Sequence, residues 1–89
     1  MKDDILYIES LKDYVRIHTV SDSLVVKGNL GSTMKLLPDD RFIRIHRSFA
    51  VAIYKVDTFN QTSLTIGNQH LLIGNSYRED TIHRLKSMS

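Results

Sequence analysis

The 89-residue sequence contains no cysteine, no tryptophan and one proline. The absence of cysteine excludes a disulfide scaffold, a thiolate zinc site and a thiol nucleophile, and it fits a reducing compartment. No apolar run approaches the ~20 residues that a membrane-spanning helix requires. The charged residues at positions 2–4 cannot begin the apolar part of an export signal. We therefore expect a cytoplasmic location.

The excess of charge of either sign is small. Twelve Lys and Arg residues against ten Asp and Glu leave a formal net charge of +2. This balance excludes a disordered acidic tail and a histone-like polycation. The 42% of hydrophobic residues can close a single core, and no repeat or Gly/Ser linker divides the chain. Residues 1–89 are therefore predicted to form one domain, which excludes a multidomain enzyme.

The first part of the chain has the patterns of a β-meander. Residues 5–8 form a short continuous apolar run, which is typical of a strand covered on both faces. Residues 14–20 alternate between apolar and polar side chains, so a half-exposed strand with a polar outer face is predicted there. Turn formers at 21–22 lead into the β-branched residues of 23–27, which indicate a third strand.

The middle of the chain predicts one short helix followed by further strands. Asn29 is a plausible N-cap for a helix that must end before Pro38, because proline cannot continue a helix. The period-two pattern returns at Phe42, and a second apolar run covers residues 49–56. Two strands or one bent strand would both fit these patterns.

The last part of the chain predicts a hairpin and a helix. Gly67-Asn68 separates two apolar segments, and both residue types tolerate the positive φ of tight β-turns. Ser76, followed three residues later by Glu79, has the spacing of a capping box that would open a C-terminal helix. The predicted fold class is mainly β, built of short antiparallel sheets with one short internal helix and one C-terminal helix.

Signals of catalysis or of metal binding are nearly absent. The four histidines show no close pairing, so a metal site would have to be assembled across strands. Ser48, His46 and Asp57 could be imagined as a nucleophile set, but nothing resembles a nucleophile elbow. No glycine-rich loop carries the lysine of a phosphate-binding loop. We therefore expect no enzymatic activity, no metal and no cofactor.

The placement of charge is more informative than its amount. Four basic residues fall in a stretch without an acid between the first and the last of them: Arg41, Arg44, Arg47 and Lys55. Arginine suits phosphate and the edge of guanine because its planar fork donates two parallel hydrogen bonds. Ordinary solvated strand faces would give the same pattern. The residues alone leave a nucleic-acid face and a solvated face both open.

Three ordered blocks resemble the LytTR family of DNA-binding domains. They are residues 4–10 (DILYIES), 13–18 (DYVRIH) and 41–49 (RFIRIHRSF). The resemblance covers nearly the whole chain, since the remaining predicted elements also stand in the family's order. It departs from the family at Ala52, where asparagine is frequent, and at Gly74-Asn75, where Ser-Arg is frequent. The loop at Gly74-Asn75, which in the family contacts DNA, thereby lacks a basic residue that could read or anchor DNA.

This resemblance implies an elongated β domain that serves as the output part of a bacterial response regulator in a two-component system. Domains of the family bind double-stranded promoter DNA as a pair of copies on direct repeats. Loops at strand ends, rather than a recognition helix, enter successive major grooves. A receiver or sensor domain would lie upstream in the full-length protein. The family's first strand is expected to be missing, which would expose an edge near Ile5 or at a neighbouring strand.

The resemblance also implies which residues contact DNA. They lie in three segments: Lys12, Tyr14 and Arg16, with Asp13 in the same loop; His46, Arg47 and Ser48; and Asn75, Ser76 and Arg78. Arg47 has the strongest physical reason, with a phosphate or carboxylate clamp as the alternative. His46 could instead pack against Tyr54 or shape its loop through a backbone hydrogen bond. Asn75 and Ser76 could cap the last helix as well as meet a phosphate.

Two other functions fit the sequence less well. A protein-interaction module would use an exposed β-edge, and it would bind protein without sensitivity to salt. A single-stranded RNA binder would need aromatic stacking platforms on a sheet. The scarcity of aromatic residues, 8% of the chain, argues against the RNA binder.

Overall fold

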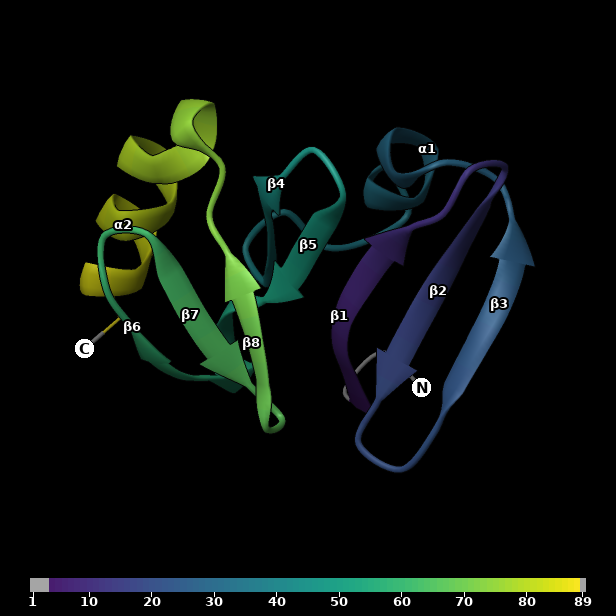
Figure 1. Ribbon diagram of the computed structural model, residues 1–89, viewed down its shortest axis with the longest axis horizontal. Helices are drawn as coiled ribbons and strands as arrows, with labels where there is room; N and C mark the ends of the chain where they lie inside the picture. The colour runs from purple at the N-terminus through teal and green to yellow at the C-terminus, as the bar shows by residue number, and fades with distance from the viewer. Residues whose placement is uncertain (1–3, 89) are drawn as a thin grey trace.

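The structure, a computed structural model, describes residues 4–88 (Figure 1). This part of the chain contains two antiparallel sheets and two α-helices. The first sheet contains β1 (Ile5–Ser10), β2 (Tyr14–Thr19), β3 (Ser23–Lys27), β4 (Phe42–His46) and β5 (Phe49–Ala52). The second contains β6 (Val56–Phe59), β7 (Ser63–Ile66) and β8 (Gln69–Leu72). The helices are α1 (Leu30–Met34) and α2 (Arg78–Lys86), and two 3-10 turns are η2 (Ile53–Lys55) and η3 (Asn75–Tyr77). The mainly β prediction is confirmed.

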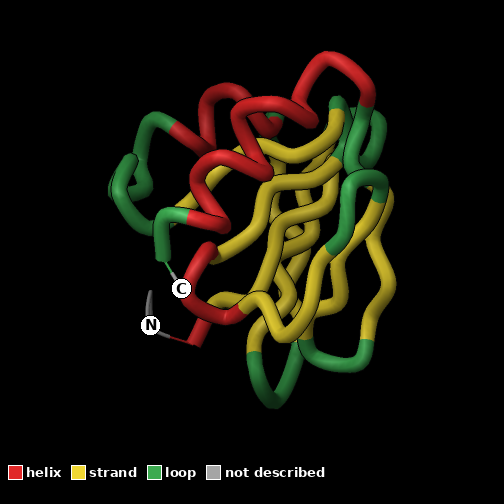
Figure 2. Tube along the Cα trace, turned by 90° about the vertical axis from the view of Figure 1, so that its left-hand side faces the viewer, coloured by secondary structure: helices red, strands yellow, loops and turns green. Residues whose placement is uncertain are grey.

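The described residues are slightly longer than they are wide, with extents of 32 × 26 × 22 Å. Figure 2 shows the strands running between turns at an upper and a lower end of the molecule. No helix among residues 4–88 is both long and apolar enough to cross a membrane.

The order of strands in the first sheet is β3-β2-β1-β5-β4, so β1 lies in its middle. Tyr7 of β1 pairs with His18 of β2 on one side and with Val51 of β5 on the other. The edges of the sheet are β3 and β4. Ile5 pairs with Thr19 of β2, and the pairing of β1 with β5 begins at Tyr7. All five residues of β3 are exposed, so a neighbouring strand forms an exposed edge.

Two hydrophobic cores lie on opposite faces of β1. Ile8 is fully buried and belongs to a small core with Val15, Leu30 and Ala50, which α1 helps to cover. Tyr7, the preceding residue, faces a larger core formed with the second sheet and α2. Successive side chains of a strand point to opposite faces, so a continuous apolar run suits a strand that is covered on both. The prediction for residues 5–8 is confirmed.

The predicted N-cap of the internal helix is confirmed. The side-chain Oδ1 of Asn29 accepts a hydrogen bond of 2.8 Å from the backbone N–H of Ser32. Leu30 anchors the helix in the smaller core. The helix is short and ends at Met34, before Pro38 is reached.

The apolar stretch after Phe42 forms two strands rather than one bent strand. A turn at residues 47–48 joins β4 to β5, and η2 then leads into β6. The sequence did not predict β6, because three of its four residues are exposed and it has no clear alternation of apolar and polar side chains. Pairing with β7 holds it in place, and the hydroxyls of Thr58 and Thr65 are 2.6 Å apart across the two strands.

The hairpin around Gly67-Asn68 is confirmed. These residues have φ angles of +52° and +70°, respectively, as a tight turn between antiparallel strands requires. A side chain at Gly67 would also collide with Leu6, because an added Cβ would stand 2.6 Å from its Cδ1 atom. Glycine thus avoids both a strained backbone and a shift of the Leu6 side chain.

The C-terminal helix exists, but the predicted capping box is wrong. The α2 helix begins at Arg78, and its N-cap, Tyr77, makes no side-chain cap hydrogen bond. Ser76 lies inside η3, where the backbone N–H of Tyr77 donates to the carbonyl of Gly74 at 2.9 Å. This extra turn moves the start of the helix past Asn75 and Ser76, so neither side chain caps it.

Candidate nucleic-acid interface

Three strand-end segments meet at one end of the molecule, the upper end in Figure 1. They are residues 11–14, 47–48 and 74–78, which together we call the loop end. The backbone N–H of Ser10 donates to the carbonyl of Ser48 at 2.8 Å, which joins the first segment to the second. The N–H of Gly74 donates to the carbonyl of Ile45, also at 2.8 Å, which joins the third. The predicted contact segments therefore lie on one connected surface.

Hydrogen bonds from two side chains shape the turn between β4 and β5. The Arg44 Nη2 atom donates to the carbonyl of Arg47 at 2.6 Å, and its Nε atom lies 3.4 Å from the carbonyl of His46. His46 Nδ1 accepts a hydrogen bond of 3.0 Å from the backbone N–H of Ser48. The backbone of the turn is therefore fixed while the Arg47 side chain remains exposed.

The loop-shaping interpretation of His46 is confirmed, and its packing against Tyr54 is wrong. Its aromatic neighbour is Phe49, at 5.4 Å between ring centroids. Tyr54 lies beyond the other end of β5 and is 67% exposed. A half-buried, hydrogen-bonded position of this kind limits how much of the imidazole can reach a ligand.

The first segment forms a tight turn with an exposed rim. The backbone N–H of Leu11 donates to the carbonyl of Tyr14 at 2.8 Å. Lys12 and Asp13 are exposed, and Tyr14 is 46% exposed. Arg16 lies farther down β2, where it pairs with Glu9 of β1. It therefore stands below the rim, on the sheet face rather than on the turn.

Arg16 shares that sheet face with an aromatic and charged cluster. The rings of Tyr7 and His18 stack with centroids 4.1 Å apart, and His18 Nε2 lies 3.1 Å from Glu9 Oε1. Burial raises the pKa of the Tyr7 phenol above its ordinary value, the Glu9 charge raises it further, and Arg16 opposes them. Arg16 thus acts electrostatically on this cluster, a role that its sequence pattern did not reveal.

The third segment presents polar groups at the start of α2. Asn75 and Ser76 are exposed, and neither is occupied as a cap. Arg78 is half-buried, and its Nε atom has no hydrogen-bond partner among residues 4–88. Helix N-termini carry unpaired N–H groups and a partial positive charge, which favour an anion nearby.

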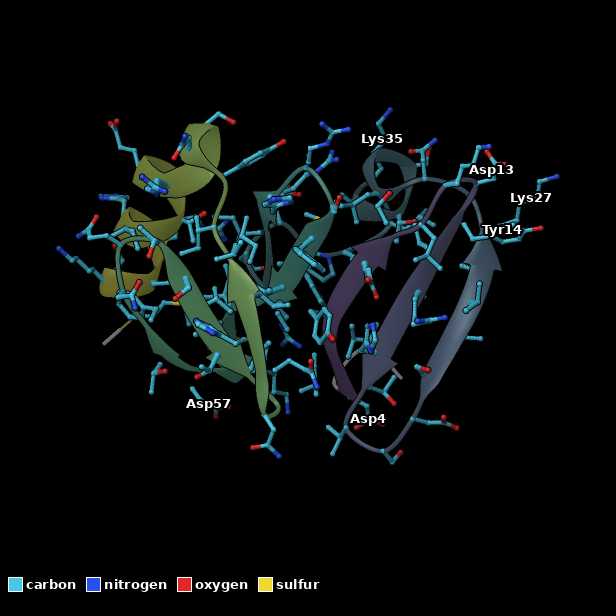
Figure 3. The ribbon with its side chains drawn as sticks, viewed as in Figure 1. Asp4, Asp13, Tyr14, Lys27, Lys35 and Asp57 are labelled. Carbon is cyan, nitrogen blue, oxygen red and sulfur yellow. The ribbon has the colours of Figure 1, made fainter. Side chains whose placement is uncertain are left out.

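Side chains of both signs lie at the loop end. Figure 3 labels Lys27 and Lys35 at the upper end and Asp4 and Asp57 at the lower edge. Asp13 is an acid at the upper end, and the exposed Glu79 and Asp80 follow residue 78 in the first turn of α2. Among residues 4–88 no cluster of three or more His, Asp or Glu side chains could hold a metal ion.

Two residues near the loop end were not predicted as site residues. Arg44 belongs to the basic stretch, yet its role in holding the turn depends on the pairing of β4 with β5. Lys27 reaches this end because β3 pairs with β2, which sets it opposite Tyr14. No local pattern in the sequence indicates either position, since both depend on how the strands pair.

The fold defines the chain as a two-sheet β domain whose strand-end segments meet at one end. The model of the family described as the LytTr DNA-binding domain matches residues 2–86. The chain belongs to this family, which confirms the resemblance seen in the sequence. Comparison with curated proteins gives no match.

One similar solved structure is the LytTr DNA-binding domain of a protein from Bacillus cereus described as a methyl-accepting/DNA response regulator. It has a TM-score of 0.84 and 24% sequence identity, and the match covers 94% of this chain and 83% of that one. At this identity the likeness shows the shared fold alone.

Proposed function

We propose that this domain binds promoter DNA sequence-specifically, as the DNA-reading part of a bacterial two-component regulator in the cytoplasm. Membership of the LytTr DNA-binding domain family supports DNA binding. The observation that carries the finer proposal is the loop end, where hydrogen bonds join three strand-end segments around an exposed Arg47.

In this proposal the turns enter the major groove and the sheets supply rigidity. Base edges need only donors and acceptors at the right depth, so turns can read them as well as a helix can. Arg47 is placed to read a base, with Ser48 beside it. Lys12, Tyr14 and the start of α2 would hold phosphates on either side. His46 and Arg44 would keep the reading turn in shape.

Pairing of two copies on a direct repeat would supply the affinity that one copy lacks. A net charge of +2 gives a single domain little long-range attraction to DNA. A receiver or sensor domain that brings two copies together would raise the effective concentration of the second. We propose that regulation acts through this pairing.

The experiment is selection of bound duplexes from a randomised pool, with the single domain and with two domains tethered. An enriched direct repeat whose affinity falls as salt rises is the expected result, because phosphate contacts release counterions. Failure of both forms to enrich any duplex would refute sequence-specific DNA binding by this domain.

One observation supports a different function, a non-catalytic protein-interaction module that uses a β-edge. The edge strand β3 exposes Leu24, Val25 and Val26 at 55%, 47% and 37%. An exposed apolar edge can accept a strand from another chain. Salt-insensitive capture of a protein, together with no duplex selection, would favour this function over DNA reading.

Arg44→Ala is expected to weaken binding of the selected duplex several-fold, although in this proposal Arg44 does not contact DNA. The substitution removes both hydrogen bonds to the turn carbonyls, each worth about 1 kcal/mol. Arg47 would then sample more conformations before binding. In amide hydrogen exchange, faster exchange should appear at the Ser48 N–H but not in the β7–β8 hairpin. An unchanged turn with unchanged affinity would show that Arg44 does not position Arg47.

A further inference from the structure

A hollow joins the first contact segment to residues that belong to none of the three predicted segments. Its volume is about 670 Å³, and six residues line it: Lys12, Asp13, Tyr14, Lys27, Gly28 and Asn29. Lys27 is the last residue of β3, and Gly28 and Asn29 link it to α1. Figure 3 shows Lys27, Tyr14 and Asp13 together at the upper right end of the molecule.

Strand pairing and one backbone bond build this hollow. Tyr14 and Lys27 are paired residues of β2 and β3. The backbone N–H of Gly28 donates to the carbonyl of Asp13 at 3.1 Å, which fastens the link to the first turn. Gly28 has φ +143°, a conformation that L side chains rarely adopt, and no atom lies within 4 Å of the position a Cβ would take. The backbone at this point is therefore open to an approaching ligand.

The chemistry of the hollow suits an anion. Two lysines and a phenol surround it, against the single carboxylate of Asp13. Neither Lys12 nor Lys27 forms an ion pair with a carboxylate among residues 4–88. Two exposed ammonium groups that form no ion pair with a described carboxylate, next to a hydroxyl donor, match the needs of a phosphodiester oxygen.

The position of the hollow favours the phosphates of a duplex held at the loop end. Ser10, at the start of the first turn, is bonded to Ser48 in the turn that carries Arg47. A duplex read by Arg47 would pass over the first turn and reach β3 beside it. Lys27 would then meet the backbone that flanks the base contact.

We propose that residues 27–29 form a fourth contact segment, in which Lys27, with Lys12 and Tyr14, binds a backbone phosphate of the DNA. This inference rests on the proposed function and extends it by one contact that carries no sequence information. It predicts a change in affinity and salt dependence without a change in the selected sequence.

The test compares Lys27→Ala with Lys55→Ala on the selected duplex and on an unrelated duplex at several salt concentrations. Lys55 is exposed and lies beyond the opposite end of β5, so its substitution makes the same charge change away from the hollow. Lys27→Ala should weaken both duplexes by the same factor, about 3- to 10-fold near 0.1 M salt, and lower the salt slope by about 0.9. Lys55→Ala should leave the slope unchanged.

Equal slopes for Lys27→Ala and Lys55→Ala would overturn the fourth segment while the wild-type selection still supports DNA reading. If the wild-type domain selected no duplex at all, the proposed function itself would be overturned. Titration with inorganic phosphate separates a duplex contact from a general anion site. Saturable shifts of the Gly28 amide with phosphate alone, without any slope change on DNA, would also overturn the proposal.

Discussion

Arg47→Ala is expected to weaken binding of the selected duplex by about 1–3 kcal/mol, roughly 5- to 160-fold, and to relax selection at one base pair. The side chain is exposed on a turn whose backbone is held by Arg44, so its guanidinium is free to reach a base. A bidentate contact with guanine is the commonest specific contact that arginine makes.

Repeating the duplex selection with Arg47→Ala and Arg47→Lys would show whether selection depends on the two parallel donors of the guanidinium or on its positive charge. Lysine keeps the positive charge but cannot present two parallel donors. We expect the lysine variant to retain the salt slope and to lose the selection. A loss of affinity that is equal on all duplexes, with selection intact, would make Arg47 a phosphate clamp instead of a reader.

Ile8→Ala is expected to destabilise the domain by about 2–5 kcal/mol, because removing a buried aliphatic side chain leaves a cavity. Ile8 is fully buried in the smaller core with Leu30 and Ala50. Domains of this size have a total stability of only about 5–15 kcal/mol, so a loss of this size is a large part of it.

Urea unfolding of purified variants would measure this change in the free energy of unfolding. Ile8→Val, which removes one methyl group, should cost about 0.5–1.5 kcal/mol. Leu36→Ala is the control, because Leu36 is 77% exposed and its substitution should stay within about 0.5 kcal/mol. If Ile8→Ala changed stability no more than Leu36→Ala, the small core would not contribute to the stability of the fold.

Elements with a strong local signal could be predicted from the sequence. The Gly67-Asn68 hairpin was predictable because few residue types adopt positive φ at two successive positions. The cap at Asn29 was predictable because a short polar side chain before an apolar one has few other local roles. In each case the residues that specify the element also lie within it.

Elements that depend on distant partners could not be predicted. The strand β6 exists because Val56 and Phe59 pair with β7, whereas its own residues are mostly exposed. The capping box failed because a 3-10 turn intervened, and its hydrogen bond reaches back to Gly74. Helix boundaries often shift when such a turn precedes the first α-helical residue.

In the candidate site, too, the positions of some residues could be predicted from the sequence, whereas roles that depend on strand pairing could not. The resemblance placed Arg47 and Ser48 on a turn, and the structure has them there. It did not indicate that Arg16 would face Tyr7 and Glu9 instead of the loop end, or that Arg44 would hold the turn. These roles depend on which strands are neighbours in the sheet, and no single segment of the sequence determines the strand order.

The position of β1 between β2 and β5 also has a consequence for folding kinetics. The β1–β2 and β4–β5 hairpins can each close within a short loop, but Tyr7 must find Val51 about half the chain away. Closing so long a loop costs entropy before any contact compensates for it, and non-local pairing slows folding. The bond between Ser10 and Ser48 that joins the first two contact segments can form only after this pairing. The proposed DNA-binding surface should therefore form late in folding, and neither hairpin alone contains it.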